Sequence, residues 1–259
     1  MKNLKFALIN IFGQDAEKLA DFASEFGFSG IDWSVDLNLD ERDFLRKMDT
    51  LKGFEVRYHC PWPHIDIAYA DQRAEQAMYI FGLLIGLISK AGGRYLTVHI
   101  GLGQSTVEEL KWEKAIENLS SLVLFGAERG ITICLENIPT GWTSNPKMFN
   151  TLVKKTGAGV SLDIGHINAC RAKEPSEKFF KLYVMPNKKR IFNAHIYYTE
   201  IPQYGHVAPE SLEQIFDYLW LLRSVTTCDW WVIELSNPDE ILQTKDLLTN
   251  FLHSYEKKS

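Results

Sequence analysis

The sequence predicts an α/β protein that folds as a single closed (β/α)8 barrel over residues 1–259. Eight short segments rich in β-branched and aromatic residues alternate along the chain with segments of helical apolar spacing. Near-continuous apolar strands of this kind are typical of a parallel sheet that is covered on its outside. Eight strand–helix units in about 250 residues fit a closed barrel better than an open sheet. The segment FGQDAEK after the first strand also lacks the G-x-G-x-x-G of a dinucleotide-binding open sheet.

The first half of the chain supplies four of these units. The expected strands are KFALIN, GIDWS, FEVRYHC and YLTVHI. Apolar residues at helical spacing predict helices over Asp15–Phe26, Leu39–Leu51 and Asp71–Lys90. The pattern Thr106-x-x-Glu109 matches a capping box and predicts that the fourth helix begins there.

The second half repeats the pattern. Its expected strands are ITICLEN, GVSLDI, IFNAHIY and WWVIEL. The helices that follow them are predicted over Asn145–Thr156, Glu174–Met185, Glu210–Val225 and Pro238–Tyr255. Trp230 and Trp231 begin the last strand, so we expect them in the core and far from the rim where the strands end.

Composition and charge restrict which partners the protein can bind and in which cellular compartment we expect it. The net charge of −5, with no basic arm, argues against a duplex DNA substrate. The four cysteines form no C-x-x-C pair, which argues against a zinc ribbon or disulfide framework and suits a reducing compartment. The longest apolar stretch, MYIFGLLIGLIS, is too short to span a bilayer, and we interpret MKNLKFALINIF as a first strand rather than a signal peptide. We therefore expect a cytoplasmic protein that does not bind a membrane.

Histidines and carboxylates end six successive predicted strands. They are His59, His99, Glu136, Asp163, His195 and Glu234. Because active sites of such barrels lie at the C-terminal ends of the strands, we expect these side chains to face one rim. The three carboxylates would repel one another there, and a divalent cation would resolve that repulsion. Imidazole and carboxylate ligands favour Mn²⁺ or Zn²⁺, with Co²⁺, Fe²⁺ and Mg²⁺ also open.

Four segments in the second half resemble one known family. CLENIP, SLDIGH, NAHIYYTE and VIELSNP, in that order, are similar to the xylose isomerase-like TIM barrels. This family includes sugar isomerases and epimerases, inosose and dehydroshikimate dehydratases, and the endonuclease IV branch. The resemblance covers nearly the whole chain and is strongest over residues 131–237. It implies that Glu136, Asp163, His195 and Glu234 hold a metal ion, and that His166 contacts the substrate.

The resemblance and the strand-end residues together favour a metal-dependent isomerase or epimerase of a sugar or sugar phosphate. Glu136 and Glu234 would act as an acid/base pair on opposite sides of a bound keto-sugar, with His166 as a third catalytic residue. The loop CPWPHID has a shape suited to covering a pocket. The predicted substrate-binding residues are His59, Trp62, His64, His99 and His206. The partner would be a small sugar-like molecule, and aromatic residues in the loops suggest a homodimer.

Other functions remain open at this point. A phosphoester hydrolase of the endonuclease IV branch would hold two or three metal ions, with histidines on strands three and four and further ligands after strand seven. The chain has His59, His99 and His206, but Tyr204 stands where that branch has an aspartate. A related dehydratase or lyase is a further alternative. A binding module with a vestigial site is the last alternative, and the complete set of four ligands argues against it.

Overall fold

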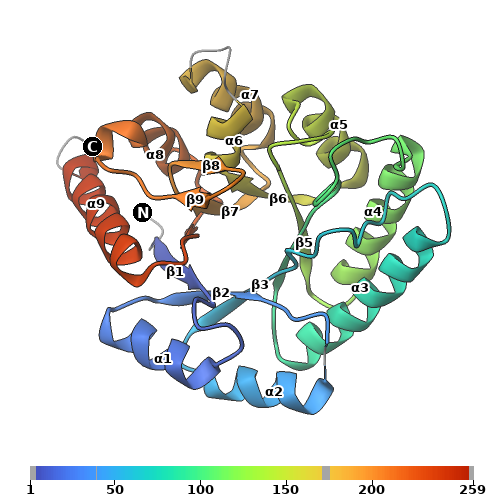
Figure 1. Ribbon diagram of the computed structural model, residues 1–259, viewed down its shortest axis with the longest axis horizontal. Helices are drawn as coiled ribbons and strands as arrows, with labels where there is room; N and C mark the ends of the chain where they lie inside the picture. The colour runs from blue at the N-terminus through green and yellow to red at the C-terminus, as the bar shows by residue number, and fades with distance from the viewer. Residues whose placement is uncertain (1–3, 39, 171–175, 257–259) are drawn as a thin grey trace.

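Eight parallel strands close into a barrel in the computed structural model, which describes residues 4–38, 40–170 and 176–256. The strands follow one another around the barrel in the order β1-β10-β7-β6-β5-β4-β3-β2, and the helices surround them (Figure 1). The barrel strands are β1 Lys5–Ile9, β2 Gly30–Ser34, β3 Glu55–His59, β4 Tyr95–Val98, β5 Thr132–Glu136, β6 Gly159–Asp163, β7 Ile191–Ile196 and β10 Trp230–Ile233. The predicted (β/α)8 barrel is confirmed.

Nine α-helices lie within the described residues, and several begin or end where the sequence indicates. They are α1 Ala16–Glu25, α2 Glu41–Thr50, α3 Arg73–Lys90, α4 Trp112–Ala127, α5 Pro146–Thr156, α6 Ile164–Cys170, α7 Ser176–Asn187, α8 Phe216–Arg223 and α9 Pro238–Glu256. The side chains of Asp15 and Asp40 cap α1 and α2, because each accepts a hydrogen bond from a backbone N–H of the first turn. None of the described helices combines the length and apolar character that crossing a membrane requires.

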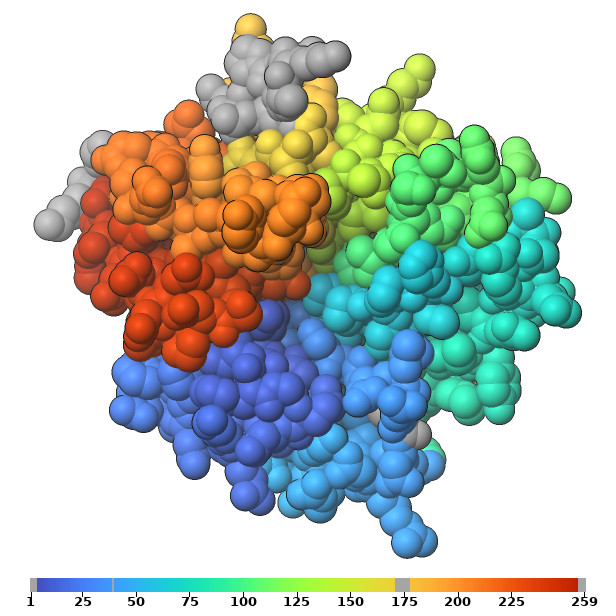
Figure 2. Space-filling view, in the orientation of Figure 1, coloured from blue at the N-terminus to red at the C-terminus, as the bar shows by residue number. Residues whose placement is uncertain are grey.

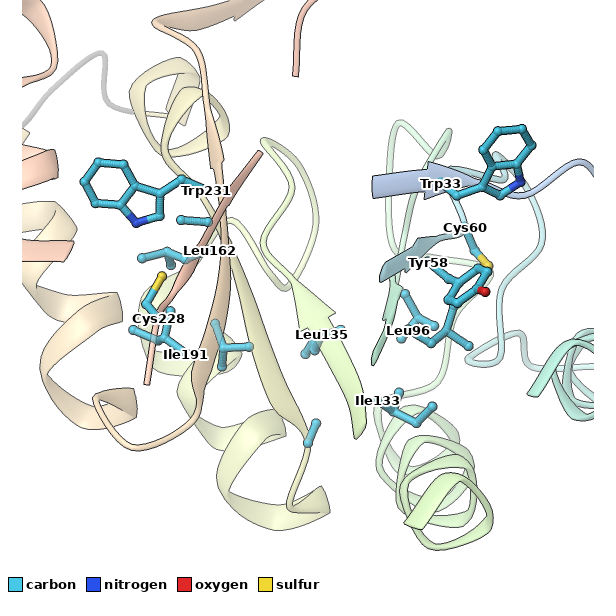
Figure 3. Close-up of a cluster of buried hydrophobic side chains, with 14 of the residues drawn as sticks. Trp33, Tyr58, Cys60, Leu96, Ile133, Leu135, Leu162, Ile191, Cys228 and Trp231 are labelled. Carbon is cyan, nitrogen blue, oxygen red and sulfur yellow. The ribbon is translucent and has the colours of Figure 1, made fainter. Parts of the chain in front are cut away.

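The two adjacent tryptophans of β10 are both fully buried, as predicted, and they lie on opposite faces of the strand. Trp231 faces the helices, with its ring centroid 6.1 Å from that of Phe251 in α9. Figure 3 shows Trp231 among the buried apolar side chains of the strands. Trp230 faces the barrel interior, where a Cβ atom built on Gly30 would lie 2.1 Å from its ring. Any side chain at position 30 would clash with the Trp230 indole, so glycine is required there.

The predicted start of the fourth helix at Thr106 is wrong. The segment 101–111 is a loop, and α4 begins only at Trp112. Leu110 forms an isolated antiparallel bridge with Tyr69, which holds the loop against the approach to α3. This tertiary pairing outweighs the local capping signal.

Two other helix predictions need correction. The helix predicted over 210–225 is divided into a 3-10 turn, Leu212–Gln214, and α8, because Ile215 between them has a non-helical φ of −123°. The helix predicted over 174–185 corresponds to α7 and ends two residues later than expected, at Asn187. Its expected first residue, Glu174, lies outside the described residues, as does Leu39 at the expected start of the second helix. The stretch after Asp163 forms α6, a helix that the sequence analysis did not include.

A short antiparallel hairpin after β7 was not predicted. It consists of β8 Thr199–Ile201 and β9 Gly205–Val207. The hairpin lies in front of β7 in Figure 1, and in Figure 2 the same orange segment forms part of the surface on that face. Since it follows the C-terminal end of β7 directly, it stands at the rim where the strands end.

Candidate metal centre

The ends of β5, β6, β7 and β10 bring the four predicted metal ligands together. One ligand atom from each of Glu136, Asp163, His195 and Glu234 lies within 4.8 Å of the others. His195 Nδ1 is 2.9 Å from Glu234 Oε2, 3.4 Å from Glu136 Oε2 and 3.8 Å from Asp163 Oδ2. All four side chains are buried. We call these four residues the quartet.

Strand pairing and the side chain of Asn137 fix the relative positions of three quartet residues, Glu136, Asp163 and His195. Asp163 and His195 are direct partners in the parallel pairing of β6 with β7. The side chain of Asn137, which follows β5, donates to the carbonyl of Asp163 and accepts from its N–H. The ends of three neighbouring strands are thereby fixed relative to one another.

The quartet contains buried polar atoms that lack a hydrogen-bond partner among the described residues. They are both carboxylate oxygens of Glu136, Asp163 Oδ2, His195 Nδ1 and Glu234 Oε2; the last two face each other at 2.9 Å, but not at the angle of a hydrogen bond. Buried polar groups are nearly always paired, and buried carboxylates require a counter-charge or a metal ion. A mixed set of one imidazole and three carboxylates suits a divalent transition metal. The residues therefore fit the cation that the sequence predicts.

Burial and the neighbouring charges both shift the pKa values of the quartet side chains. Burial alone would lower the pKa of His195, but Glu136 and Glu234 raise it well above its ordinary value. Burial raises the pKa of Asp163 well above its ordinary value, and the charges of Glu136 and Glu234 add to this effect. The protein's own groups thus neutralise the cluster only by holding protons in it, and a cation could replace those protons.

His59 and His99, from β3 and the end of β4, extend the centre on one side. The Nε2 atoms of the two rings are 3.2 Å apart, and each lies 3.5 Å from Glu136 Oε2. His99 Nδ1 is 3.1 Å from the carbonyl oxygen of Cys60 and donates to it, so Nε2 is the ring nitrogen that faces His59 and Glu136. Burial lowers the pKa of His59 to about 3, which keeps that ring neutral. His59, His99 and Glu136 form a second group able to hold a metal ion.

A third such group lies on the hairpin side and contains His166, Glu200 and His206. His166, in α6, has Nδ1 2.9 Å from the carbonyl oxygen of Asn137 and Nε2 3.4 Å from Glu200 Oε2. His206, in β9, has Nδ1 2.8 Å from the carbonyl oxygen of Glu234 and stacks on the ring of Tyr197. Sequence reasoning missed Glu200, because a three-residue strand carries no recognisable pattern.

Asp32 is a further buried carboxylate that the sequence analysis missed. It lies inside β2, and its Oδ1 is 3.8 Å from His59 Nδ1, while its Oδ2 accepts from the indole N–H of Trp230. Burial raises its pKa to about 6. Asp32, His59 and His195 also offer ligand atoms within 4.8 Å of one another. The acidic residue within the apolar segment GIDWS is the feature of the sequence that could have pointed to Asp32.

Trp62 and His64 do not join these groups. Trp62 is buried, packs against Phe81 and donates its indole N–H to the carbonyl oxygen of Val35. His64 is exposed and has a φ of 63°. Neither belongs to a ligand group found among the described residues. Their predicted role in binding substrate stays a prediction.

Comparison with known proteins identifies the family. A family profile described as "Xylose isomerase-like TIM barrel" matches residues 20–250, so the chain belongs to this family. The uncharacterized protein MJ0008 of Methanocaldococcus jannaschii is 30% identical over 174 residues, which are 67% of this chain and 74% of that protein.

Solved structures with the same fold include sugar epimerases and an endonuclease IV. A D-tagatose 3-epimerase-like protein has a TM-score of 0.77 at 18% identity, covering 98% of this chain and 99% of the other. An L-ribulose 3-epimerase also has a TM-score of 0.77, at 16% identity, covering 98% and 96%. Endonuclease IV from Thermus thermophilus has a TM-score of 0.70 at 15% identity, covering 96% and 99%. At these identities the likeness concerns the fold alone.

Proposed function

We propose that this protein is a divalent-metal-dependent isomerase or epimerase that acts on a sugar or a sugar phosphate. The observation that carries the proposal is the pair Glu136 and Glu234, which approach His195 from two separate strands with buried oxygens that lack hydrogen-bond partners. The epimerases among the structures of the same fold support this choice.

The quartet would hold the metal ion, with Mn²⁺ or Zn²⁺ as the best match to its donors. A bound ion would act as a Lewis acid on the carbonyl and hydroxyl oxygens of a keto-sugar. One of Glu136 and Glu234 removes the proton from the carbon beside the carbonyl, and the other returns a proton to the opposite face or to the neighbouring carbon. His166 keeps its Nδ1–H on the carbonyl oxygen of Asn137 and so presents Nε2 to a substrate oxygen.

The test is solvent exchange in D₂O with a panel of free and phosphorylated keto-sugars. Proton transfer predicts that deuterium enters beside the carbonyl of one class of sugar, in proportion to enzyme and only with metal present. Elemental analysis of the purified protein should then give one tightly bound divalent ion per chain. Absence of exchange across the panel, with a metal-loaded protein, would remove this function.

A phosphoester hydrolase is the second candidate, and the two additional ligand groups favour it. His59, His99 and Glu136 form one, and His166, Glu200 and His206 form the other. Glu200 offers a carboxylate from the hairpin. Tyr204, which stands where the endonuclease IV branch has an aspartate, is 83% exposed. Two or three neighbouring metal ions are suited to binding a phosphodiester.

Metal stoichiometry and a phosphodiesterase assay separate the two candidates. Two or three ions per chain, with turnover of a phosphodiester such as bis(p-nitrophenyl) phosphate, would favour the hydrolase. One ion per chain, with exchange into a keto-sugar, would favour the isomerase or epimerase. The net charge of −5 makes duplex DNA a poor substrate in either case.

A further inference from the structure

A column of hydrogen-bonded polar side chains runs through the barrel interior below the quartet. It consists of Ser161 on β6, Thr97 on β4, Asn193 on β7 and Arg57 on β3, and all four are buried. Branched apolar residues usually fill the interior of such barrels, so a polar layer at this level calls for a reason. We call these four residues the polar column.

The polar column reaches the quartet through one ring nitrogen. Ser161 Oγ lies 3.3 Å from His195 Nε2 and 3.3 Å from Thr97 Oγ1. Asn193 Nδ2 donates to Thr97 Oγ1 at 3.3 Å. The residues at the two ends of this chain of contacts, His195 and Asn193, are both on β7.

Arg57 anchors the lower end of the column. Its guanidinium donates to Asn193 Oδ1 at 2.5 Å and forms ion pairs with Glu55 and Asp229 at 3.0 and 3.1 Å. The same guanidinium lies over the rings of Tyr95 and Trp230, 4.1 and 4.4 Å from their centroids. Because the Arg57 guanidinium is held by these contacts, it has little conformational freedom. It therefore fixes the orientation of Asn193 and, through Asn193, that of Thr97.

The position of the proton on His195 decides whether the ring can bind a cation. Its Nδ1 faces Glu136 and Glu234, so a metal ion in the quartet needs the lone pair of Nδ1 and the proton must sit on Nε2. When the ring gives up a proton to bind a cation, the competing tautomer keeps the remaining proton on Nδ1, where the charge of Glu234, with Oε2 2.9 Å away, favours it. Some group must therefore favour the Nε2–H form.

We propose that Ser161 is a positioning residue that selects this tautomer, by accepting a hydrogen bond from His195 Nε2–H, and that the polar column holds Ser161 in place. The proposal rests on the metal-dependent function proposed above. Thr97 Oγ1 accepts from Asn193 Nδ2 and donates its own hydrogen to Ser161 Oγ. Ser161 Oγ keeps a second lone pair, which faces His195 Nε2 and can accept from the imidazole. Without Ser161, the Nε2–H group would be buried and unpaired, and the form with Nδ1–H would gain.

Ser161→Ala tests the proposal, with Thr97→Val as the matched control. Thr97→Val removes a buried hydroxyl of the same column but does not touch His195. We expect Ser161→Ala to weaken binding of Mn²⁺ or Zn²⁺ by about 10- to 100-fold in a chelator competition, as loss of an outer-shell partner of a metal ligand does. We expect Thr97→Val to weaken binding less than Ser161→Ala, because the serine hydroxyl stays in place and loses only one of its contacts, at a similar loss of thermal stability.

The second readout is ¹⁵N NMR of the histidine side chains in the metal-free protein. In the wild type, His195 should show a protonated Nε2 whose proton exchanges slowly with water, and Ser161→Ala should shift that resonance and speed its exchange. Ser161→Cys, which keeps a weaker hydrogen-bonding group of similar size, should fall between the two and provides the measurement if the alanine variant does not fold.

Three results would overturn the role of Ser161. They are an unchanged metal affinity in Ser161→Ala, an equal loss of affinity in both variants, and a wild-type His195 that carries its proton on Nδ1 alone. Failure of the proposed function looks different. In that case the wild-type protein would bind no stoichiometric divalent ion, and the NMR comparison would still decide whether Ser161 holds Nε2–H.

Discussion

Addition of Mn²⁺ or Zn²⁺ to chelator-treated protein should raise its thermal unfolding temperature. The quartet presents buried oxygens and a ring nitrogen without hydrogen-bond partners among the described residues, and leaving such an atom unpaired costs about 1–3 kcal/mol. A cation that binds the folded chain and not the unfolded one stabilises the fold by mass action. At about 100 times the dissociation constant this amounts to about 2.7 kcal/mol. Because about 1 kcal/mol shifts the midpoint by about 2–4 °C in a protein near this size, we expect an increase on the order of 5–10 °C.

The assay is differential scanning calorimetry over a series of metal concentrations, with two matched variants. Asp163→Asn keeps the size of a quartet side chain but removes its charge, and it should abolish most of the shift. Asp71→Asn makes the same change at an exposed residue that pairs with Arg73, and it should leave the shift intact. An equal shift in both variants, or none in the wild type, would refute the assignment of the cation to the quartet.

Three further predictions follow from single side chains. Glu234→Gln should reduce turnover by about 10²- to 10⁴-fold, the usual contribution of a general acid or base, while circular dichroism stays that of the wild type; activity near the original level would contradict the two-glutamate mechanism. Glu200→Gln should lower the number of metal ions per chain by one in elemental analysis if the hydrolase is right, and should leave it unchanged if the isomerase is right. Gly30→Ala should destabilise the fold by about 1–3 kcal/mol in urea titration, since the new methyl group would meet the ring of Trp230, whereas Gly53→Ala, with open space around it, should not.

The barrel and the meeting of the strand-end side chains could be predicted from regular features of the sequence, whereas the choice of the quartet among them came from the resemblance to a family. Each barrel strand is a short apolar run, and Asp163, His195 and Glu234 stand at or next to the ends of their strands. In a parallel barrel all strand ends meet at one rim, so knowledge of the ends suffices to bring their side chains together. No long-range contact had to be guessed.

The additional parts of the centre depend on contacts that no local pattern encodes. Asp32 stands inside its strand rather than at its end, so the pattern of strand-end residues does not include it. Glu200 lies on a strand too short to show alternation, and its approach to His166 depends on how the hairpin folds back. The capping pattern at Thr106 failed for the same reason, since a distant pairing of Leu110 with Tyr69 decides that segment.

The side chains of the centre come from two separate parts of the chain, the barrel strands and the hairpin of β8 and β9. The barrel strands carry the quartet, whereas Glu200 and His206 are borne by a separate excursion over residues 199–207 that contributes no strand to the cylinder. Substitutions in this segment can therefore change the side chains beside the quartet without altering the strands of the barrel.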